Sequence, residues 1–449
     1  MKTVSLQFGD GQIEIRLPDA ADILTAKKAT PLSDPAASIR RSLDRPIGCP
    51  ALCKLAAGAD SAAVVVSDNT RPIPYKGPAG VLPPIIETLQ RSGVKDVKII
   101  IACGTHRLME PDEIRDMLGP SAFQKGIEVI NHVATDEFTL RCIGSTDRTP
   151  NITVNKHYLD ARLKIATGLV EPHFMAGFSG GRKAICPGIC GENVTYGFHS
   201  AAMLNEEGAT GLKLNGNPCH EEALRIAGMA GVDFIVNVAI DCEKRLTGVF
   251  GGALEEAHLA AAEHVSQYSV IELDKLYDVV IMPAGYIGVN HYQCAKAAYE
   301  SSRAARPGGK IILVGHLKER QPIGGRNYKD MLRLLACLGP AGFMNKILSD
   351  DWTFVPDQWQ VQMWAKAFAK LGGSKNLYIC APRLEDSPED LIPEVNVAAQ
   401  TKRMEGESDV DFAERSLQQT VEQVIVPSDS VLVLPDGPYS IPVLSHSAD

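Results

Sequence analysis

Four polar clusters in this 449-residue chain follow short apolar runs, and each carries side chains that could hold an anion or move a proton. Ligands bind outside the carboxyl ends of strands in open α/β sheets. A single histidine there is more often an ordinary loop residue, but four clusters at equivalent positions predict a site. The clusters are Asp68-Asn69-Thr70-Arg71-Pro72, Gly104-Thr105-His106-Arg107, Glu171-Pro172-His173, and the group Tyr292, Gln293 and Lys296.

The segment from Glu171 to Gly191, EPHFMAGFSGGRKAICPGICG, is rich in glycine and carries the neighbouring cations Arg182 and Lys183. Such a loop can turn backbone N–H groups toward an anion, and adjacent cations add charge. It lacks the spacing and the Gly-Lys-Ser/Thr ending of a Walker A loop, which disfavours an NTPase. A flexible connector is the plain alternative. His173 and His199 flank the cations, and their spacing is not a metal signature, although neutral imidazole suits nickel, zinc or copper.

The strands and helices that would position these clusters alternate along the chain. Apolar runs at 62–68, 97–107 and 276–286 predict strands, with helices between them, and this rhythm indicates mostly parallel sheets covered by helices. The opening stretch QFGDG followed by QIEIRLP predicts a β-hairpin. In the second half, Gln293 and Lys296 would share one face of a helix that begins near Asn290, although a solvated face would show the same spacing.

These patterns predict an α/β protein with two domains. We expect an N-terminal cofactor-binding domain over residues 1–270, a C-terminal α/β domain over 271–420, and a segment at 421–449 whose sheet is open. A helix over the stretch LEEAHLAAAEHVSQYSVIE is expected to bridge the two units.

Composition limits the class of protein. Acidic residues outnumber basic ones by 54 to 45, and no Lys/Arg run is dense enough for a nucleic-acid footprint. No stretch reads as a secretory signal or approaches eighteen consecutive apolar residues. The eleven cysteines are an odd number without a zinc-ribbon or C-x-x-C pattern. We therefore expect a cytoplasmic protein with reduced thiols that binds neither membrane nor nucleic acid.

Taken together, these segments resemble the nickel-pincer-dependent lactate racemase family over most of the chain. The motifs that carry the resemblance are SDNTRPIP (67–74), CGTHR (103–107), EPHFMAGFSGGRKAICPG (171–188), His199, YQCAK (292–296) and PDQWQVQ (356–362). The resemblance implies two α/β domains around a central cleft. It also implies an isomerase whose cofactor is a nickel pyridinium-3,5-bisthiocarboxylic acid mononucleotide, supplied by separate cofactor-biosynthesis proteins.

The same resemblance implies roles for individual residues. Lys183 would form a thioamide to the cofactor, and His199 would be the nickel ligand. The remaining cofactor-binding positions would be Asp68, Thr70, Arg71, Ser179, Gly180, Gly181 and Trp359. The substrate carboxylate would be oriented by Arg71, Tyr292, Gln293 and Lys296.

A hydride-transfer mechanism would use the two strand-end histidines as acid and base. Removing the hydroxyl proton of a 2-hydroxy acid needs a base near neutrality, which His106 and His173 can each provide. The cofactor would then take the hydride and return it to the opposite face of the planar keto acid.

The sequence limits the substrate to the class of 2-hydroxy carboxylates and does not select one member of that class. Lactate-specific relatives have a Gly-Gly-Tyr-Pro stretch and an Asp before the Tyr-Gln-x-x-Lys helix, whereas this chain has AlaGlyTyrIleGlyValAsn at 284–290. An aldonate epimerase with the same mechanism is one alternative. From other classes, a zinc-dependent hydrolase that uses His106, His173 and His199, and a non-catalytic anion-binding protein, remain alternatives.

Overall fold

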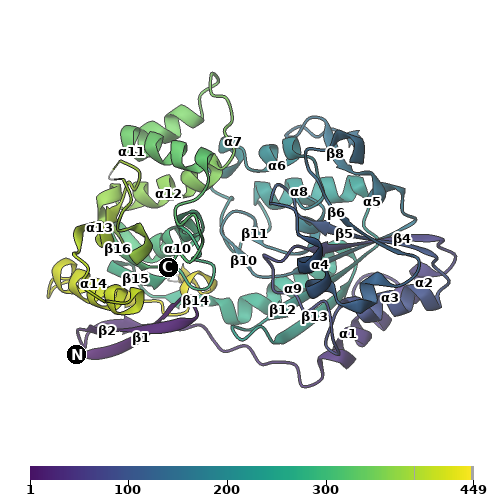
Figure 1. Ribbon diagram of the computed structural model, residues 1–449, viewed down its shortest axis with the longest axis horizontal. Helices are drawn as coiled ribbons and strands as arrows, with labels where there is room; N and C mark the ends of the chain where they lie inside the picture. Colours follow the sequence, from purple (N-terminus) through teal and green to yellow (C-terminus); the bar gives the residue numbers. More distant parts are fainter. Residues whose placement is uncertain (389, 446–449) are drawn as a thin grey trace. The chain divides into compact units, whose positions relative to one another are not determined.

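The structure, a computed structural model, describes residues 1–388 and 390–445 and divides into two compact units (Figure 1). The central unit is Lys28–Tyr268. The terminal unit combines Met1–Lys27 with Ser269–Asp449 and so contains both ends of the chain. Within the described residues, no helix is long and apolar enough to cross a membrane.

The central unit is built on a six-stranded sheet with the order β13-β12-β9-β4-β5-β6. All neighbouring strands are parallel except the antiparallel pair β12–β13. Helices cover both faces, and the middle strands β4 and β9 are mostly apolar and largely buried. The strands are β4 (Ser61–Ser67), β5 (Asp96–Ala102), β6 (Ile127–Asn131), β9 (Leu163–Leu169), β12 (Phe234–Ile240) and β13 (Leu246–Gly252).

Short helices and two small antiparallel ribbons complete this unit. The helices are α1 (Pro35–Asp44), α2 (Leu52–Ala56), α3 (Leu82–Arg91), α4 (Pro111–Leu118), α5 (Lys156–Asp160), α6 (Glu192–Phe198), α7 (Ala201–Asn205), α8 (Pro218–Ala230) and α9 (Leu254–Ser269). The ribbons are β7 (Leu140–Gly144) with β8 (Ile152–Asn155), and β10 (Pro172–His173) with β11 (Gly177–Phe178).

The terminal unit holds a second six-stranded sheet, wholly parallel, with the order β18-β17-β16-β15-β19-β3. Its strands are β3 (Asp22–Ile23), β15 (Tyr277–Pro283), β16 (Ala305–Val314), β17 (Leu377–Cys380), β18 (Val395–Asn396) and β19 (Val431–Val433). Its helices are α10 (His291–Ala304), α11 (Arg326–Ile347, kinked at Gly339), α12 (Gln358–Lys370), α13 (Val397–Gln400) and α14 (Asp409–Val424). The predicted α/β class with mostly parallel sheets is confirmed.

The opening hairpin is confirmed as β1 (Lys2–Phe8) paired with β2 (Gly11–Leu17). Its inward side chains join the core of the terminal unit, where they pack with β15, β16 and α14. Strand β3 pairs with β19. The first 27 residues therefore group with the C-terminal part of the chain, whereas the sequence placed residues 1–270 in one domain. An alternating pattern predicts a hairpin but does not reveal which sheet it packs against.

Helix α10 ends at Ala304, and β16 begins at Ala305 and includes Pro307 with the two glycines after it. The 421–449 segment contributes β19 to the large sheet, and β20 (Ile441–Leu444) pairs with β14 (Val270–Leu273). Residues 446–449 of that segment lie outside the described residues.

Glu300 on α10 gives the terminal unit a pH-dependent stability. The residue is 1% exposed, and burial raises the pKa of its carboxyl to about 7, with Arg303 opposing the shift. Because the pKa of Glu300 is higher in the folded state than the 4.5 of the unfolded chain, its contribution to the free energy of unfolding is fully present below pH 4.5. This contribution is lost as the pH rises through 7. Glu300→Gln should therefore stabilise the protein at pH 8 by about 3 kcal/mol relative to its effect at pH 5.

Urea unfolding followed by tryptophan fluorescence measures this difference, because all three tryptophans lie in the terminal unit. The exposed Glu272 on β14 provides the control, Glu272→Gln. Equal effects of Glu300→Gln at the two pH values would contradict the assignment.

Candidate functional site

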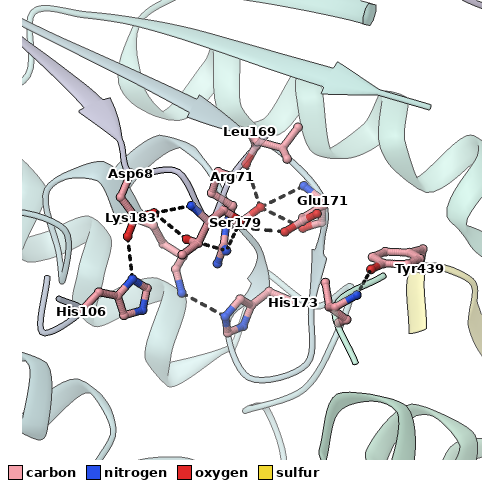
Figure 2. A network of polar contacts seen from close by, with 11 residues as sticks. Asp68, Arg71, His106, Leu169, Glu171, His173, Ser179, Lys183 and Tyr439 are labelled. Carbon is pink, nitrogen blue, oxygen red and sulfur yellow. Dashed lines mark hydrogen bonds and ion pairs between the residues drawn. The ribbon is translucent and has the colours of Figure 1, made fainter. Parts of the chain in front are cut away.

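Three of the predicted clusters follow strands that are neighbours in the sheet of the central unit. Strands β9, β4 and β5 lie side by side and run parallel, so their carboxyl ends meet at one edge. The loop after β4 carries Asp68, the loop after β5 carries His106, and the segment after β9 carries His173. Figure 2 shows these side chains gathered together. The topology thus brings three distant sequence segments to one place, as the sequence predicted.

His106 is held by a buried carboxylate. Its Nδ1 lies 2.7 Å from Oδ2 of Asp68, which is 4% exposed (Figure 2). Burial alone would raise the pKa of Asp68, but hydrogen bonds from His106 and Thr70 hold it below its usual value. A carboxylate at Nδ1 requires the proton there, so the neutral imidazole has its lone pair at Nε2. With its side chain 57% exposed, His106 can act as a base.

His173 has the opposite arrangement. Its Nδ1 accepts the backbone N–H groups of Met175 and Ala176, at 3.3 and 3.2 Å. The neutral ring must then carry its proton on Nε2, which lies 3.1 Å from Nζ of Lys183 (Figure 2). The two histidines therefore present complementary groups, a lone pair on His106 and an N–H on His173.

Arg71 supplies an accessible positive charge beside them. Its Nε lies 3.6 Å from Oε1 of Glu171, and both side chains are about a quarter exposed. A partly exposed ion pair of this length is weak. An anionic ligand could therefore compete with Glu171 for the guanidinium, as the predicted role of Arg71 requires.

The glycine-rich loop is packed against its own unit. Backbone N–H groups of Ser179, Gly181 and Lys183 donate to protein oxygens, those of Glu171, Asn237 and Gly180 respectively. The Ser179 hydroxyl donates to the carbonyl of Leu169 at 2.7 Å. These three amides do not form the predicted anion cradle, because two of them bond within the Glu171–Gly191 segment and the third bonds to Asn237 on β12.

Close approach explains the two central glycines. Both have positive φ, and a Cβ at Gly180 would lie 2.5 Å from the side-chain oxygen of Asn237. A Cβ at Gly181 would lie 2.7 Å from the ring of His258. Any side chain at either position would push the loop away from the sheet.

Arg182 points into the protein, which the sequence did not predict. It is fully buried, and it donates to the carbonyls of Ala176 and Phe178 and contacts Nε2 of His258. Burial lowers the pKa of its guanidinium to about 9. Arg182 therefore fixes the shape of the loop, and its neighbour Lys183 is the cation that faces the histidines.

His199 is neutral and oriented. It caps the end of α6, two residues before α7 begins, and its Nδ1 donates to the carbonyl of Thr195 at 2.8 Å. Burial, and next the charge of Lys183, lower its pKa to about 3. A histidine with Nδ1–H bound to a carbonyl keeps its Nε2 lone pair, which is the usual preparation of a metal ligand.

In the terminal unit, the predicted substrate residues share the first turns of α10. Its N-cap is Asn290, whose side chain accepts from the backbone N–H of Gln293. Trp359 on α12 donates its indole N–H to the hydroxyl of Tyr292 at 2.9 Å. The structure thus joins two residues to which the sequence gave separate roles, one toward cofactor and one toward substrate.

Sequence reasoning missed several partners that shape the site. It placed Asp68 with the cofactor and did not find its bond to His106, nor Glu171 as the partner of Arg71. The adjacency of these residues to strand ends was the available signal. In residues 1–388 and 390–445, no three or more His, Cys, Asp or Glu side chains are grouped to hold a metal ion. His106, His173 and His199 therefore do not form the zinc site of the hydrolase alternative.

Comparison with known proteins identifies the family. Residues 8–211 match the sequence profile of the lactate racemase N-terminal domain. The chain is 30% identical to the lactate racemase of Thermoanaerobacterium thermosaccharolyticum over 374 residues, which are 82% of this chain and 86% of that protein. It is also 30% identical to the lactate racemase of Lactiplantibacillus plantarum over 333 residues, 73% and 76% of the two chains.

Comparison with solved structures gives the same family. The lactate racemase apoprotein from T. thermosaccharolyticum superimposes with a TM-score of 0.85 at 27% identity, covering 99% of this chain and 100% of that one. A Thermotoga maritima protein at 18% identity shares the fold, with a TM-score of 0.65 over 93% and 100% of the chains. From the sequence identity over most of its length and the shared fold, the chain belongs to the lactate racemase family of isomerases.

Proposed function

We propose that this protein is a racemase or epimerase that inverts the carbinol carbon of a small 2-hydroxy carboxylate by reversible hydride transfer. The observation that carries the proposal is the pair of histidines after β5 and β9, the two strands that flank β4, with His106 bonded to Asp68 and His173 to Lys183. Both lie within the matched N-terminal domain. Two relatives named lactate racemase make lactate the first substrate to test.

Two residues have the chemistry that a nickel-pincer nucleotide would need. His199 offers a neutral imidazole with its Nε2 lone pair unprotonated, and imidazole is a favourable nickel ligand. Lys183 offers the primary amine that acylation to a thioamide requires, and its Nζ lies 3.1 Å from Nε2 of His173. When bound, this group supplies a position that takes a hydride from the substrate carbon and returns it.

The protein's own residues would move the protons. His106 removes the hydroxyl proton with Nε2, and the resulting imidazolium is stabilised by the carboxylate of Asp68. Inversion then needs a proton from a different donor, which His173 would give in its imidazolium form and so become a neutral imidazole. For the opposite enantiomer the two roles exchange. Before the same enantiomer can react again, the proton left on the first histidine must be lost and the second histidine must be protonated again.

Substrate orientation would fall to the accessible cation Arg71. From their motif we also propose that Tyr292, Gln293 and Lys296 bind the substrate, that Trp359 packs against the cofactor, and that cofactor-biosynthesis proteins load the enzyme. Asp68 and Thr70 are proposed to remain near the cofactor, together with Ser179, Gly180 and Gly181. In this proposal the glycines act by letting the loop lie close to the sheet.

Isotope retention tests the mechanism. Enzyme co-produced with the cofactor-making proteins should racemise lactate deuterated at C2 with most of the deuterium kept in the product and with a primary isotope effect on kcat. Hydride return from a held acceptor keeps the label, whereas removal of the carbon-bound hydrogen as a proton exchanges it with water. Complete loss of deuterium at each inversion would overturn the proposal.

The same assay on malate, phenyllactate and gluconate separates a small hydroxy acid from an aldonate as substrate. Turnover of gluconate well above that of lactate would favour the epimerase alternative, for which the segment 284–290 is the reason.

A further inference from the structure

A fully buried polar chain lies behind Tyr292 in the terminal unit. The side chains of His291 and Glu394 are 0% exposed, with Nε2 of the histidine 2.6 Å from Oε1 of the glutamate. Nδ1 of His291 lies 2.8 Å from the hydroxyl of Tyr328, and Trp364 donates its indole N–H to that same hydroxyl at 2.8 Å. Four segments far apart in sequence therefore converge on one line of hydrogen bonds.

The donors and acceptors of this chain alternate without conflict. Trp364 N–H donates to the Tyr328 oxygen, and the Tyr328 hydroxyl donates to Nδ1 of His291. The proton of the neutral imidazole is then on Nε2, from which it is donated to the carboxylate of Glu394. The hydrogen bonds that join these buried side chains restrict each of them to one orientation relative to the next.

Burying such a network costs more desolvation free energy than filling the same space with apolar side chains. A buried carboxylate loses its hydration, and Oε2 of Glu394 has no hydrogen-bond partner among the described residues. Buried ionic groups are weak contributors to stability, and their best-attested use is to fix one conformation. The arrangement that this network fixes is the start of α10.

Tyr292 is the residue that this arrangement holds. It follows His291 directly, and its ring packs edge-on against Tyr328 with the centroids 5.0 Å apart. Its carbonyl accepts from Gln360 at 2.6 Å, and its hydroxyl accepts from Trp359 at 2.9 Å. Backbone, ring and hydroxyl of Tyr292 are each held, and the ring contact is made by a member of the buried chain.

We infer that the chain Glu394–His291–Tyr328 positions the side chain of Tyr292. Glu394 is then a positioning residue for the reaction, and that last step rests on the proposed function, in which Tyr292 contacts the substrate. Breaking the chain at Glu394 should let His291 and Tyr328 move, and Tyr292 with them.

The three tryptophans allow a test that needs no activity. Each indole N–H has a different partner. Trp364 reports on Tyr328, Trp359 reports on Tyr292, and Trp352 donates to Gln358 outside the buried chain. Protein labelled with 15N-tryptophan gives three indole signals, which single Trp→Phe variants assign.

Glu394→Met should shift the Trp364 and Trp359 signals and leave that of Trp352 in place. Glu394→Gln keeps an oxygen acceptor for His291 and should restore the Trp359 signal to near its wild-type position. The matched control is Glu300→Gln, which alters a buried carboxylate on α10 outside this network and should leave the Trp359 signal unchanged. A Trp359 signal that stays fixed in Glu394→Met while Trp364 moves would overturn the inference.

If the methionine variant does not fold, Tyr328→Phe breaks the same chain by removing one oxygen, and the same shift of Trp359 is expected. A shift of Trp359 in Glu300→Gln as large as in Glu394→Met would equally contradict the inference, since it would show a general loosening of α10.

Kinetics of the loaded enzyme then connect the network to the reaction. Glu394→Met should lower kcat/KM by roughly tenfold to a hundredfold, as small misplacements of orienting groups do. In a Tyr292→Phe background the same change should have little further effect, because both act through one side chain. If the Trp359 signal moves but Tyr292→Phe leaves kcat/KM unchanged, the positioning stands and the proposed substrate role of Tyr292 fails.

Discussion

Replacing His106 with glutamine is expected to lower kcat of the loaded enzyme by about 10²–10⁴-fold, the range of a lost general base. Glutamine is similar in size but cannot take the hydroxyl proton of the substrate. The neighbouring carboxylate of Asp68 cannot substitute for it, because it is buried and its Oδ1 accepts from Thr70. Initial rates measured separately from each enantiomer of the best substrate provide the comparison.

These two rates contain an internal check. Enantiomers have equal free energies, so for a racemisation kcat/KM must fall by the same factor in both directions, although kcat and KM can change separately. Asp68→Asn should cause a smaller loss than His106→Gln, since the base remains and loses only the charge that stabilises its imidazolium. A variant at His157, outside the site on α5, is the control. Activity of His106→Gln within twofold of wild type would remove His106 from the mechanism.

The fold was largely predictable because its strands are buried on both faces. The run 99–103 is apolar at every position, and such a run between helices indicates a parallel strand, here β5. The membership of the first 27 residues was not predictable in this way. Their hairpin is determined by local alternation, but its packing against β15 and β16 depends on contacts with residues some 270 to 310 positions later.

For the site too, the features set by local sequence were predictable and those set by packing were not. Strand-end position is a local property, and it correctly placed Asp68, His106 and the His173 segment at one edge of the sheet. The direction of a side chain depends on what packs around it. Arg182 and Lys183 are adjacent and alike in charge, yet Arg182 is buried beneath the loop and Lys183 meets His173. Nothing in the order Arg-Lys distinguishes the two.

The tautomers of the two histidines could likewise be assigned only from the structure. His106 and His173 look equivalent in sequence, each two or three residues into a polar cluster. A carboxylate faces Nδ1 of the first, and two backbone N–H groups face Nδ1 of the second. In their neutral forms the ring protons are therefore on different nitrogens, and only the surrounding contacts determine this difference.

Lys183 carries the second large prediction, which concerns covalent loading. Lys183→Arg keeps a positive charge but has no amine that can be acylated, and the guanidinium stays protonated. We expect protein co-produced with the cofactor-making proteins to show a single added mass in the wild type and none in Lys183→Arg. Racemase activity should fall to the background of the apoprotein in parallel.

The control is Lys213→Ala, which removes an exposed lysine of the same unit and should leave the added mass and the activity unchanged. His199→Ala separates attachment from metal binding, because it should keep the added mass on Lys183 while elemental analysis shows the nickel content reduced. Lys183→Arg protein with the full added mass on another residue would contradict attachment at Lys183. If the wild-type protein were fully active without any added mass, Lys183 would not be the attachment point. Its remaining role would be the hydrogen bond to His173 in proton transfer.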